Sequence, residues 1–291
     1  MVPLEGVITA MLTPFDSDGR IMTKAIPDFV KYQAEKGVNG LFVCGSTGLF
    51  PLMKVEERKM IAEETIRYAK GKMFVIVQVG APDTSTAIEL AKHAEKAGAD
   101  GVASVAPYYY HHGDDALKLH YKSIAESISI PLYVYNIPRY AGTSIGLGLL
   151  QQLADAGIIA GMKDSGRDFL QLVEVIQNMP DDFHVVNGTE GYILEALLAG
   201  ASGMVAALGN AFPDLLVRLY RSYTKNLKEA KEMQKLINKA KSVTDKFSIS
   251  SLYEVVRERN IQYGYPRAPF MKMGKVERDM MIKELKELKL I

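Results

Sequence analysis

Short apolar runs alternate with amphipathic stretches along the first three quarters of the chain. Each run is apolar throughout and rich in valine and isoleucine, which is typical of strands buried on both faces. The runs predict eight strands, at residues 6–12, 40–43, 74–79, 101–105, 132–135, 158–162, 184–186 and 203–206. The stretches between them, with apolar positions three or four residues apart, predict helices at 23–36, 55–70, 84–97, 114–127, 168–178 and 213–223.

Three of the strands are preceded by the same local sequence. Gly37, Gly98 and Gly200 each follow a helical stretch, and a second glycine begins the next strand three residues later. Glycine ends helices because it adopts the left-handed conformation without steric cost. Alternating helices and apolar strands predict a parallel sheet covered by helices, and eight repeats predict closure into a (β/α)8 TIM barrel of the α/β class. An open, doubly wound sheet is the alternative.

The chain beyond residue 224 shows no further strand pattern. Residues 225–291 predict three helices whose lysine-rich sides face solvent. Because no segment rich in proline or serine precedes them, we expect a barrel domain at 1–224 with a C-terminal three-helix extension at 225–291 packed against it.

Composition narrows the classes of function. Of the 291 residues, 48% are hydrophobic and 24% charged, as in an ordinary globular protein. The net charge of +1 provides no basic field, so we expect neither a nucleic-acid partner nor an anionic membrane partner. A single cysteine, Cys44, excludes an internal disulfide and fits a reducing compartment. Since no apolar run could span a bilayer and no signal pattern begins the chain, we expect a cytoplasmic location.

One lysine stands at the end of an apolar strand. Lys163 directly follows the predicted strand at 158–162, where an ammonium group would lose much of its hydration. This loss lowers the pKa of a lysine and makes its neutral, nucleophilic form available near neutral pH, as a Schiff-base lysine requires. The alternatives are that Lys163 turns out to solvent or pairs with Asp164.

Hydroxyl groups follow several other strands, and the carboxyl ends of barrel strands meet at one rim. The run Gly45-Ser46-Thr47-Gly48 offers backbone amides and hydroxyls that suit a carboxylate or a phosphate, although a simple strand-to-helix turn also explains it. Tyr135 ends the strand next to that of Lys163, so its phenol either transfers protons there or belongs to the core. Further polar candidates at the rim are Ser165, Asn187 and Thr189.

Neither a metal centre nor a cysteine nucleophile is predicted. Cys44 has no histidine near it in sequence and is interpreted as a small buried residue. The histidines form no pair with the spacing of metal ligands, so we expect no metal; they are His93, His111, His112, His120 and His184.

Four motifs, in this order, resemble those of the dihydrodipicolinate synthase and N-acetylneuraminate lyase family of class I aldolases. The resemblance runs over nearly the whole chain. The motifs are Gly45-Ser46-Thr47-Gly48, Pro107-Tyr108-Tyr109, Tyr135-Asn136-Ile137-Pro138 and Gly161-Met162-Lys163-Asp164.

The resemblance implies a role for the matching residues. Lys163 would form the Schiff base and Tyr135 would transfer protons. Ser46 and Thr47 would hold the carboxylate of pyruvate, with Thr47 also linked to Tyr135. Tyr109 would reach into the site of a neighbouring subunit, which implies an oligomer, in the family usually a homotetramer. The resemblance implies no cofactor beyond the covalent imine.

Departures from the family pattern narrow the expected activity. Synthases and lyases commonly carry an acid where Leu49 stands. The synthases of amino-acid biosynthesis also carry an arginine where Tyr140 stands, with Arg139 one position early here. Leu49, the triplet Tyr108-Tyr109-Tyr110 and the tail Gly264-Tyr265-Pro266-Arg267 resemble the archaeal 2-keto-3-deoxygluconate aldolases instead.

The sequence therefore predicts a class I aldolase that cleaves 2-keto-3-deoxygluconate reversibly to pyruvate and glyceraldehyde. Its partners would be a small keto acid and an aldehyde, with Ser165, Asn187 and Thr189 contacting the sugar hydroxyls. Members that also take the phosphorylated sugar acid carry an arginine where His112 stands, which argues against a phosphate site. The alternatives are dihydrodipicolinate synthase activity, N-acetylneuraminate lyase activity, and a non-catalytic relative that binds pyruvate.

Overall fold

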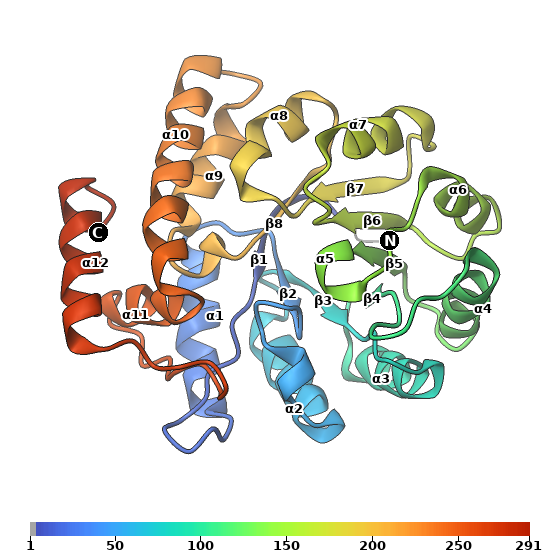
Figure 1. Cartoon of the computed structure of the whole chain (residues 1–291), viewed down its shortest axis with the longest axis horizontal. Helices are drawn as coiled ribbons and strands as arrows, with labels where there is room; N and C mark the ends of the chain where they lie inside the picture. Colours follow the sequence, from blue (N-terminus) through green and yellow to red (C-terminus); the bar gives the residue numbers. More distant parts are fainter. Residues whose placement is uncertain (1–3) are drawn as a thin grey trace.

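Eight parallel strands close into a barrel in the computed structural model, which describes residues 4–291. Each strand pairs with its neighbours in sequence, and β8 pairs with β1 (Figure 1). The predicted TIM barrel is confirmed and the open sheet is wrong. The strands are β1 (Gly6–Ala10), β2 (Gly40–Val43), β3 (Phe74–Gln78), β4 (Gly101–Val105), β5 (Leu132–Asn136), β6 (Gly161–Asp164), β7 (His184–Asn187) and β8 (Gly203–Ala206).

Helices form a ring outside the strands (Figure 1). None of those in the described part of the chain combines the length and the apolar composition that crossing a membrane requires. They are α1 (Ile26–Glu35), α2 (Val55–Ala69), α3 (Thr84–Ala97), α4 (Asp114–Ala125), α5 (Pro138–Ala141), α6 (Leu147–Asp155), α7 (Phe169–Asn178), α8 (Ile193–Leu198), α9 (Pro213–Ser222), α10 (Leu227–Thr244), α11 (Ser250–Glu258) and α12 (Lys275–Glu287). Short 3-10 helices are η1 (Thr23–Ala25), η2 (Phe50–Leu52), η3 (Glu190–Tyr192), η4 (Leu208–Asn210) and η5 (Asp245–Phe247).

The sixth strand begins three residues later than predicted. Residues 158–160 form the loop after α6, where the amide of Ile158 donates to the carbonyl of Leu153 at 2.9 Å. Ile159 is nevertheless buried, and apolar burial in a loop gives the same sequence pattern as burial in a strand. Lys163 therefore lies inside β6, and Asp164 ends the strand.

The register of β5, β6 and β7 places the candidate residues on one face. Tyr135 lies opposite Lys163, which in turn lies opposite Val186 on β7. Residues opposite each other on neighbouring parallel strands point to the same side of the sheet, here the inside of the barrel. The phenol and the amine thus share the barrel interior.

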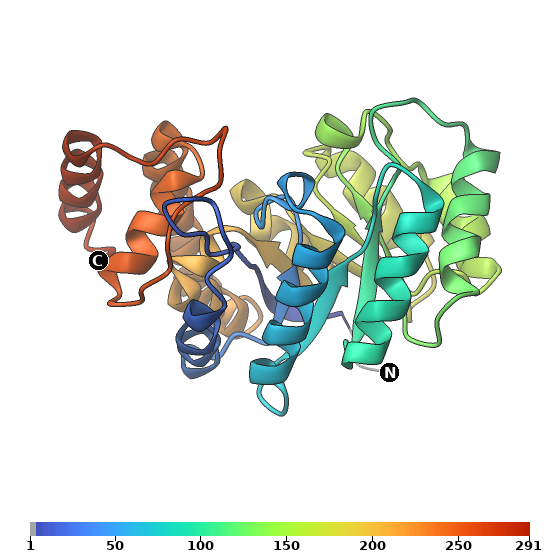
Figure 2. The ribbon, with the colours of Figure 1, turned by 90° about the horizontal axis from the view of Figure 1, so that it is seen from below.

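The C-terminal helices pack against one side of the barrel, with α12 outermost (Figures 1 and 2). Two buried tyrosines attach this region to the segment after β1. The hydroxyl of Tyr253 donates to the carbonyl of Thr13 at 2.7 Å, and that of Tyr263 donates to the carbonyl of Leu12 at 2.7 Å. The three predicted helices are present, and these two contacts fix α11 and the residues just after it to the segment that follows β1.

Replacing Tyr253 with phenylalanine should measure the strength of this attachment. The ring remains, but the carbonyl of Thr13 stays buried without its donor, so we expect the free energy of unfolding to fall by about 1–3 kcal/mol. Urea unfolding followed by circular dichroism measures the change. Tyr223→Phe is the control, because the ring of Tyr223 packs on Tyr220 while its hydroxyl makes no hydrogen bond among residues 4–291. Equal losses in the two variants would contradict the proposed attachment.

Candidate active site

A cavity of about 990 Å³ opens at the carboxyl ends of the strands. The loops after β2, β5, β6 and β7 line it, together with residues of α10 and the segment that follows it. Such a cavity is the usual ligand site of a TIM barrel. Six of the predicted site residues line it, namely Ser46, Thr47, Tyr135, Lys163, Ser165 and Thr189, whereas Gly45, Tyr109 and Asn187 do not.

Lys163 lies at the bottom of this cavity and is only 4% exposed. Its Nζ atom is 4.1 Å from the centre of the Phe42 ring and 3.8 Å from the centre of the Tyr135 ring. Burial lowers the pKa of Lys163 to about 7, although the charge of Glu190 opposes the shift and that of Arg139 adds to it. Near neutral pH, a substantial share of the amine is therefore uncharged and nucleophilic.

Neither alternative for Lys163 fits the structure. The side chain is buried rather than turned to solvent, and Asp164, the next residue on the strand, points to the opposite face. The carboxylate of Asp164 instead accepts hydrogen bonds from Nδ2 of Asn136 at 2.8 Å and from the amide of Gly166 at 3.3 Å. The Asn136–Asp164 contact joins β5 to β6 and so holds Tyr135 beside Lys163.

The phenol of Tyr135 belongs to a chain of hydroxyl groups. Its oxygen lies 3.2 Å from Oγ of Ser46, and it also hydrogen-bonds Ser165. Burial raises the pKa of Tyr135, and the hydrogen bonds with the two serines partly offset the shift. The resemblance implied a link from Thr47 to Tyr135, but the hydrogen bond is made by Ser46. The arrangement provides a path along which protons can move close to Lys163.

The turn that carries Ser46 and Thr47 is held in a fixed shape. Cys44 and Leu49, on either side of it, adopt left-handed conformations with φ of 56° and 60°, which side chains other than glycine rarely take. The hydroxyl of Thr13 donates to the carbonyl of Gly48 at 2.7 Å. Gly45 is needed for space, since a Cβ atom there would lie 3.0 Å from the Phe42 ring. It therefore shapes the turn without lining the cavity.

Asn187 and Thr189, both predicted to contact the substrate, have different positions around the end of β7. The side chain of Asn187 is buried and closes a local turn, with Nδ2 donating to the carbonyl of Thr189 and Oδ1 accepting its amide, both at 2.9 Å. Asn187 thus supports the loop and does not reach the cavity, contrary to the prediction. Thr189 faces the cavity and can contact a substrate.

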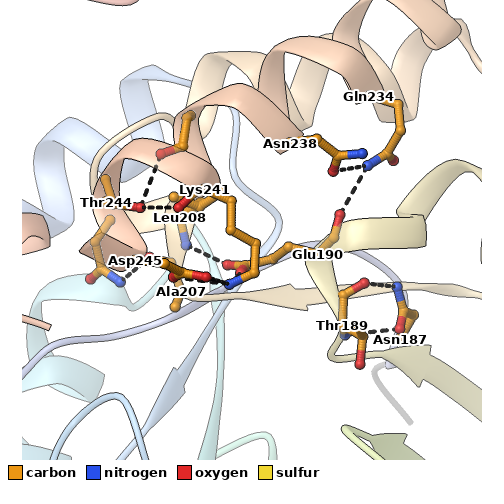
Figure 3. A network of polar contacts seen from close by, with 12 residues as sticks. Asn187, Thr189, Glu190, Ala207, Leu208, Gln234, Asn238, Lys241, Thr244 and Asp245 are labelled. Carbon is orange, nitrogen blue, oxygen red and sulfur yellow. Dashed lines mark hydrogen bonds and ion pairs between the residues drawn. The ribbon is translucent and has the colours of Figure 1, made fainter. Parts of the chain in front are cut away.

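Glu190 and Lys241 were not among the predicted site residues, yet both line the cavity. Figure 3 shows them as an ion pair, with a distance of 3.1 Å between Nζ and Oε2. The other carboxylate oxygen of Glu190 accepts the amide of Leu208 at 2.7 Å. An acid following a barrel strand was a usable signal for Glu190. No local pattern in the sequence could assign Lys241, which comes from α10.

Tyr109 does not line the cavity that contains Lys163 of the same chain. Its side chain is 86% exposed and its ring packs against that of Tyr110, with centroids 5.0 Å apart. Its backbone φ of 86° lies in the left-handed region. The neighbouring Tyr108 lines the cavity instead. A contribution of Tyr109 to another subunit's site stays a prediction.

Neither the thiol of Cys44 nor the possible metal ligands form a second reactive site in the described part of the chain. Cys44 is 1% exposed, and burial raises the pKa of its thiol to about 11, as expected for a small core residue. Within residues 4–291, no three or more histidine, cysteine, aspartate or glutamate side chains gather as a metal site would require.

The lowered pKa of Lys163 predicts a pH-dependent stability difference between the wild type and Lys163→Met. Between the folded value of about 7 and the ordinary value of 10.5, the unfolded chain binds a proton that the folded chain has released. Wild-type stability should therefore rise with pH in this window, by about 1.4 kcal/mol per pH unit relative to the variant. Urea unfolding should show that the free energy of unfolding of the wild type rises by about 2 kcal/mol relative to that of Lys163→Met between pH 7.5 and pH 9. The exposed Lys225→Met is the control, and a pH-independent difference for Lys163→Met would contradict the assignment.

Comparisons with known proteins cover most or nearly all of the chain and point to one family. A model of the dihydrodipicolinate synthetase family matches residues 3–288. A 4-hydroxy-tetrahydrodipicolinate synthase from Archaeoglobus fulgidus is 32% identical over 295 aligned positions, covering 99% of both chains. A synthase of the same name from Chlorobium phaeovibrioides is 34% identical over 234 residues, covering 80% of this chain and 79% of the relative.

Solved structures of the same family also match this chain. YagE, a prophage protein of the dihydrodipicolinic acid synthase family from E. coli K12, was solved in complex with pyruvate. It superposes with a TM-score of 0.95 at 26% identity, covering 100% of both chains. With the family model matching nearly every residue, this chain belongs to the dihydrodipicolinate synthetase family, a family of pyruvate-dependent lyases and synthases.

Proposed function

We propose that this protein is a class I aldolase that cleaves 2-keto-3-deoxygluconate reversibly to pyruvate and glyceraldehyde. The observation that carries the proposal is the buried amine of Lys163, with its pKa lowered to about 7, against the ring of Tyr135. Enzymes of this family work through a Schiff base between pyruvate and a lysine, without a further cofactor. A cavity lined by several hydroxyl groups supports a sugar acid as substrate.

The reaction begins with capture of the keto acid. The substrate carboxylate binds at Ser46 and Thr47, and the neutral amine of Lys163 attacks the C2 ketone. The carbinolamine loses water to give an iminium ion. Tyr135 supplies and recovers protons through its contacts with Ser46 and Ser165. Because strands β5 and β6 already hold the amine and the phenol in place, these two groups have little orientational freedom to lose at this step.

The iminium ion then draws electrons from the C3–C4 bond. Tyr135 accepts the proton of the C4 hydroxyl, the bond breaks, and glyceraldehyde leaves. The electron pair of the broken bond remains on the pyruvate half as an enamine. Protonation at C3 and hydrolysis of the imine then release pyruvate and restore the amine of Lys163.

Synthesis of 4-hydroxy-tetrahydrodipicolinate is the second candidate, and the names of the relatives favour it. Arg139 lines the cavity, so a guanidinium is available there although Tyr140 stands where synthases carry their arginine. Leu49 in place of an acid counts against this activity. N-acetylneuraminate lyase activity and a non-catalytic pyruvate-binding role would use the same pyruvate half of the cavity.

Incubation with pyruvate and borohydride should fix a pyruvate adduct on Lys163, which peptide mass spectrometry can locate. Assays should then compare cleavage of 2-keto-3-deoxygluconate, its phosphate and N-acetylneuraminate with synthesis of 4-hydroxy-tetrahydrodipicolinate. We expect 2-keto-3-deoxygluconate to have the highest kcat/KM. No adduct in the wild type would overturn the Schiff-base mechanism, whereas preference for another substrate would overturn only the choice of substrate.

Tyr135→Phe should separate proton transfer from binding. The ring that covers Lys163 remains, but the hydroxyl that joins Ser46 and Ser165 is lost. We expect kcat for cleavage to fall by about 10²–10⁴-fold, the usual contribution of a positioned general acid–base, with a much smaller change in KM. Steady-state kinetics measure this, with Tyr223→Phe as the control. A fall of less than threefold would show that another group moves the proton.

A further inference from the structure

The C-terminal region supplies one side of the cavity. Lys241 and Thr244 come from α10, Asp245 from η5, Ser248 from the turn that follows and Ser251 from α11. The keto acid end, with Lys163 and Tyr135, comes from the barrel strands. The aldehyde half of a substrate must therefore extend between the barrel loops and the C-terminal region.

Lys241 is held between two carboxylates on this side. Its Nζ atom lies 3.1 Å from Oε2 of Glu190 and 3.0 Å from Oδ2 of Asp245 (Figure 3). The Lys241 side chain is 28% exposed, the Glu190 side chain 9% and the Asp245 side chain 62%. One ammonium group against two carboxylates leaves a local excess of negative charge, which opposes the binding of a phosphate.

The cluster is fixed in place by contacts on its far side. The side chain of Gln234 on α10 donates to the carbonyl of Glu190 and accepts the amide of Leu194, both at 2.9 Å. The other carboxylate oxygen of Glu190 is occupied by the amide of Leu208. If Lys241 turned towards an anionic ligand, Glu190 would lose its counter-ion while still buried, which is unfavourable. Lys241 is therefore not free to follow a phosphate.

Two hydroxyl groups on this side, those of Thr244 and Ser251, present acceptors to the cavity. Thr244 donates its proton to the carbonyls of Ala240 and Lys241, at 3.0 and 3.2 Å. Ser251 donates to the carbonyl of Ser248 at 2.7 Å. With these protons used, the oxygens of both hydroxyls and of Asp245 remain as acceptors. Acceptors bind the O–H groups of a polyol, whereas an ionised phosphate has little to donate to them.

Two further cations line the cavity at a different place. Arg139 in α5 and Arg167 in the loop after β6 are exposed and make no ion pair among residues 4–291. A keto acid brings one carboxylate of its own into the cavity, and these guanidinium groups can balance it. One carboxylate balances only one of the two guanidinium groups, so it is the Lys241 cluster, whose single cation is already paired with two carboxylates, that disfavours a phosphate on the C-terminal side of the cavity.

We propose that Lys241, together with Glu190 and Asp245, determines the specificity for the aldehyde half of the substrate. The cluster recognises the uncharged hydroxyl groups of a sugar acid and discriminates against its phosphate ester. This inference rests on the proposed aldolase function and adds the residues that would distinguish the sugar acid from its phosphate. It also makes the C-terminal region part of the site.

The test compares condensation of pyruvate with glyceraldehyde and with glyceraldehyde 3-phosphate. The wild type should have the higher kcat/KM with glyceraldehyde. Asp245→Asn removes one negative charge but keeps a polar side chain, and it should shift the ratio of the two kcat/KM values towards the phosphate by about tenfold. Lys241→Met should raise KM for glyceraldehyde by about tenfold with a much smaller effect on KM for pyruvate.

Two exposed positions serve as matched controls. Lys239→Met lies on the same helix as Lys241, and Asp155→Asn lies at the end of α6, outside the cavity. Both should leave the ratio of the two aldehydes unchanged. Because Lys241→Met leaves Glu190 unpaired and can reduce stability, each variant is first shown to be folded by circular dichroism. Asp245, which is exposed, gives the test that does not depend on folding.

Borohydride trapping of pyruvate on every variant separates the two proposals. No adduct in the wild type would overturn the aldolase function itself. If the adduct forms, the specificity proposal is overturned by a wild-type preference for the phosphate or by an unchanged ratio in Asp245→Asn. Equal rises of KM for pyruvate and glyceraldehyde in Lys241→Met would also overturn it, because they would indicate general damage to the cavity.

Discussion

The site depends on one constraint, the removal of the Lys163 amine from water. Lowering its pKa from 10.5 to about 7 corresponds to about 5 kcal/mol of solvation lost by the ammonium form. A closed barrel can maintain this, because its interior is filled by packed side chains and its strands are fixed by hydrogen bonds on both sides. The rings of Phe42 and Tyr135 cover the amine, so the groups that exclude water also include the one that transfers protons.

The strand register places the proton-transfer group next to the buried amine. Tyr135 and Lys163 are directly opposite each other on the inner face, and Asn136 and Asp164, the next residues, are joined on the outer face. A slip of one residue would turn the phenol and the amine to different faces. The C-terminal region completes the site from the other side, since α10 brings Lys241 to Glu190.

Much of this architecture followed from periodicity and local motifs. Alternating apolar runs and amphipathic stretches predicted the barrel, and Lys163 stood out because a lysine after an apolar run is unusual. The boundary of β6 was wrong because Ile159 is buried in a loop, and α5, α6 and α8 were not singled out, two of them being only four and six residues long. Asn187 was assigned to the cavity because its position at a strand end does not reveal that its side chain closes a turn.

The sequence by itself determined the fold class, the candidate lysine and most, but not all, of the polar residues that line the cavity. These depend on patterns within about ten residues, which the chain displays directly. Only the tertiary structure decided that Ser46, rather than Thr47, contacts Tyr135, and that Lys241 pairs with Glu190. Contacts of this kind join elements that are distant in sequence, and they depend on side-chain directions that are fixed only when strands and helices pack.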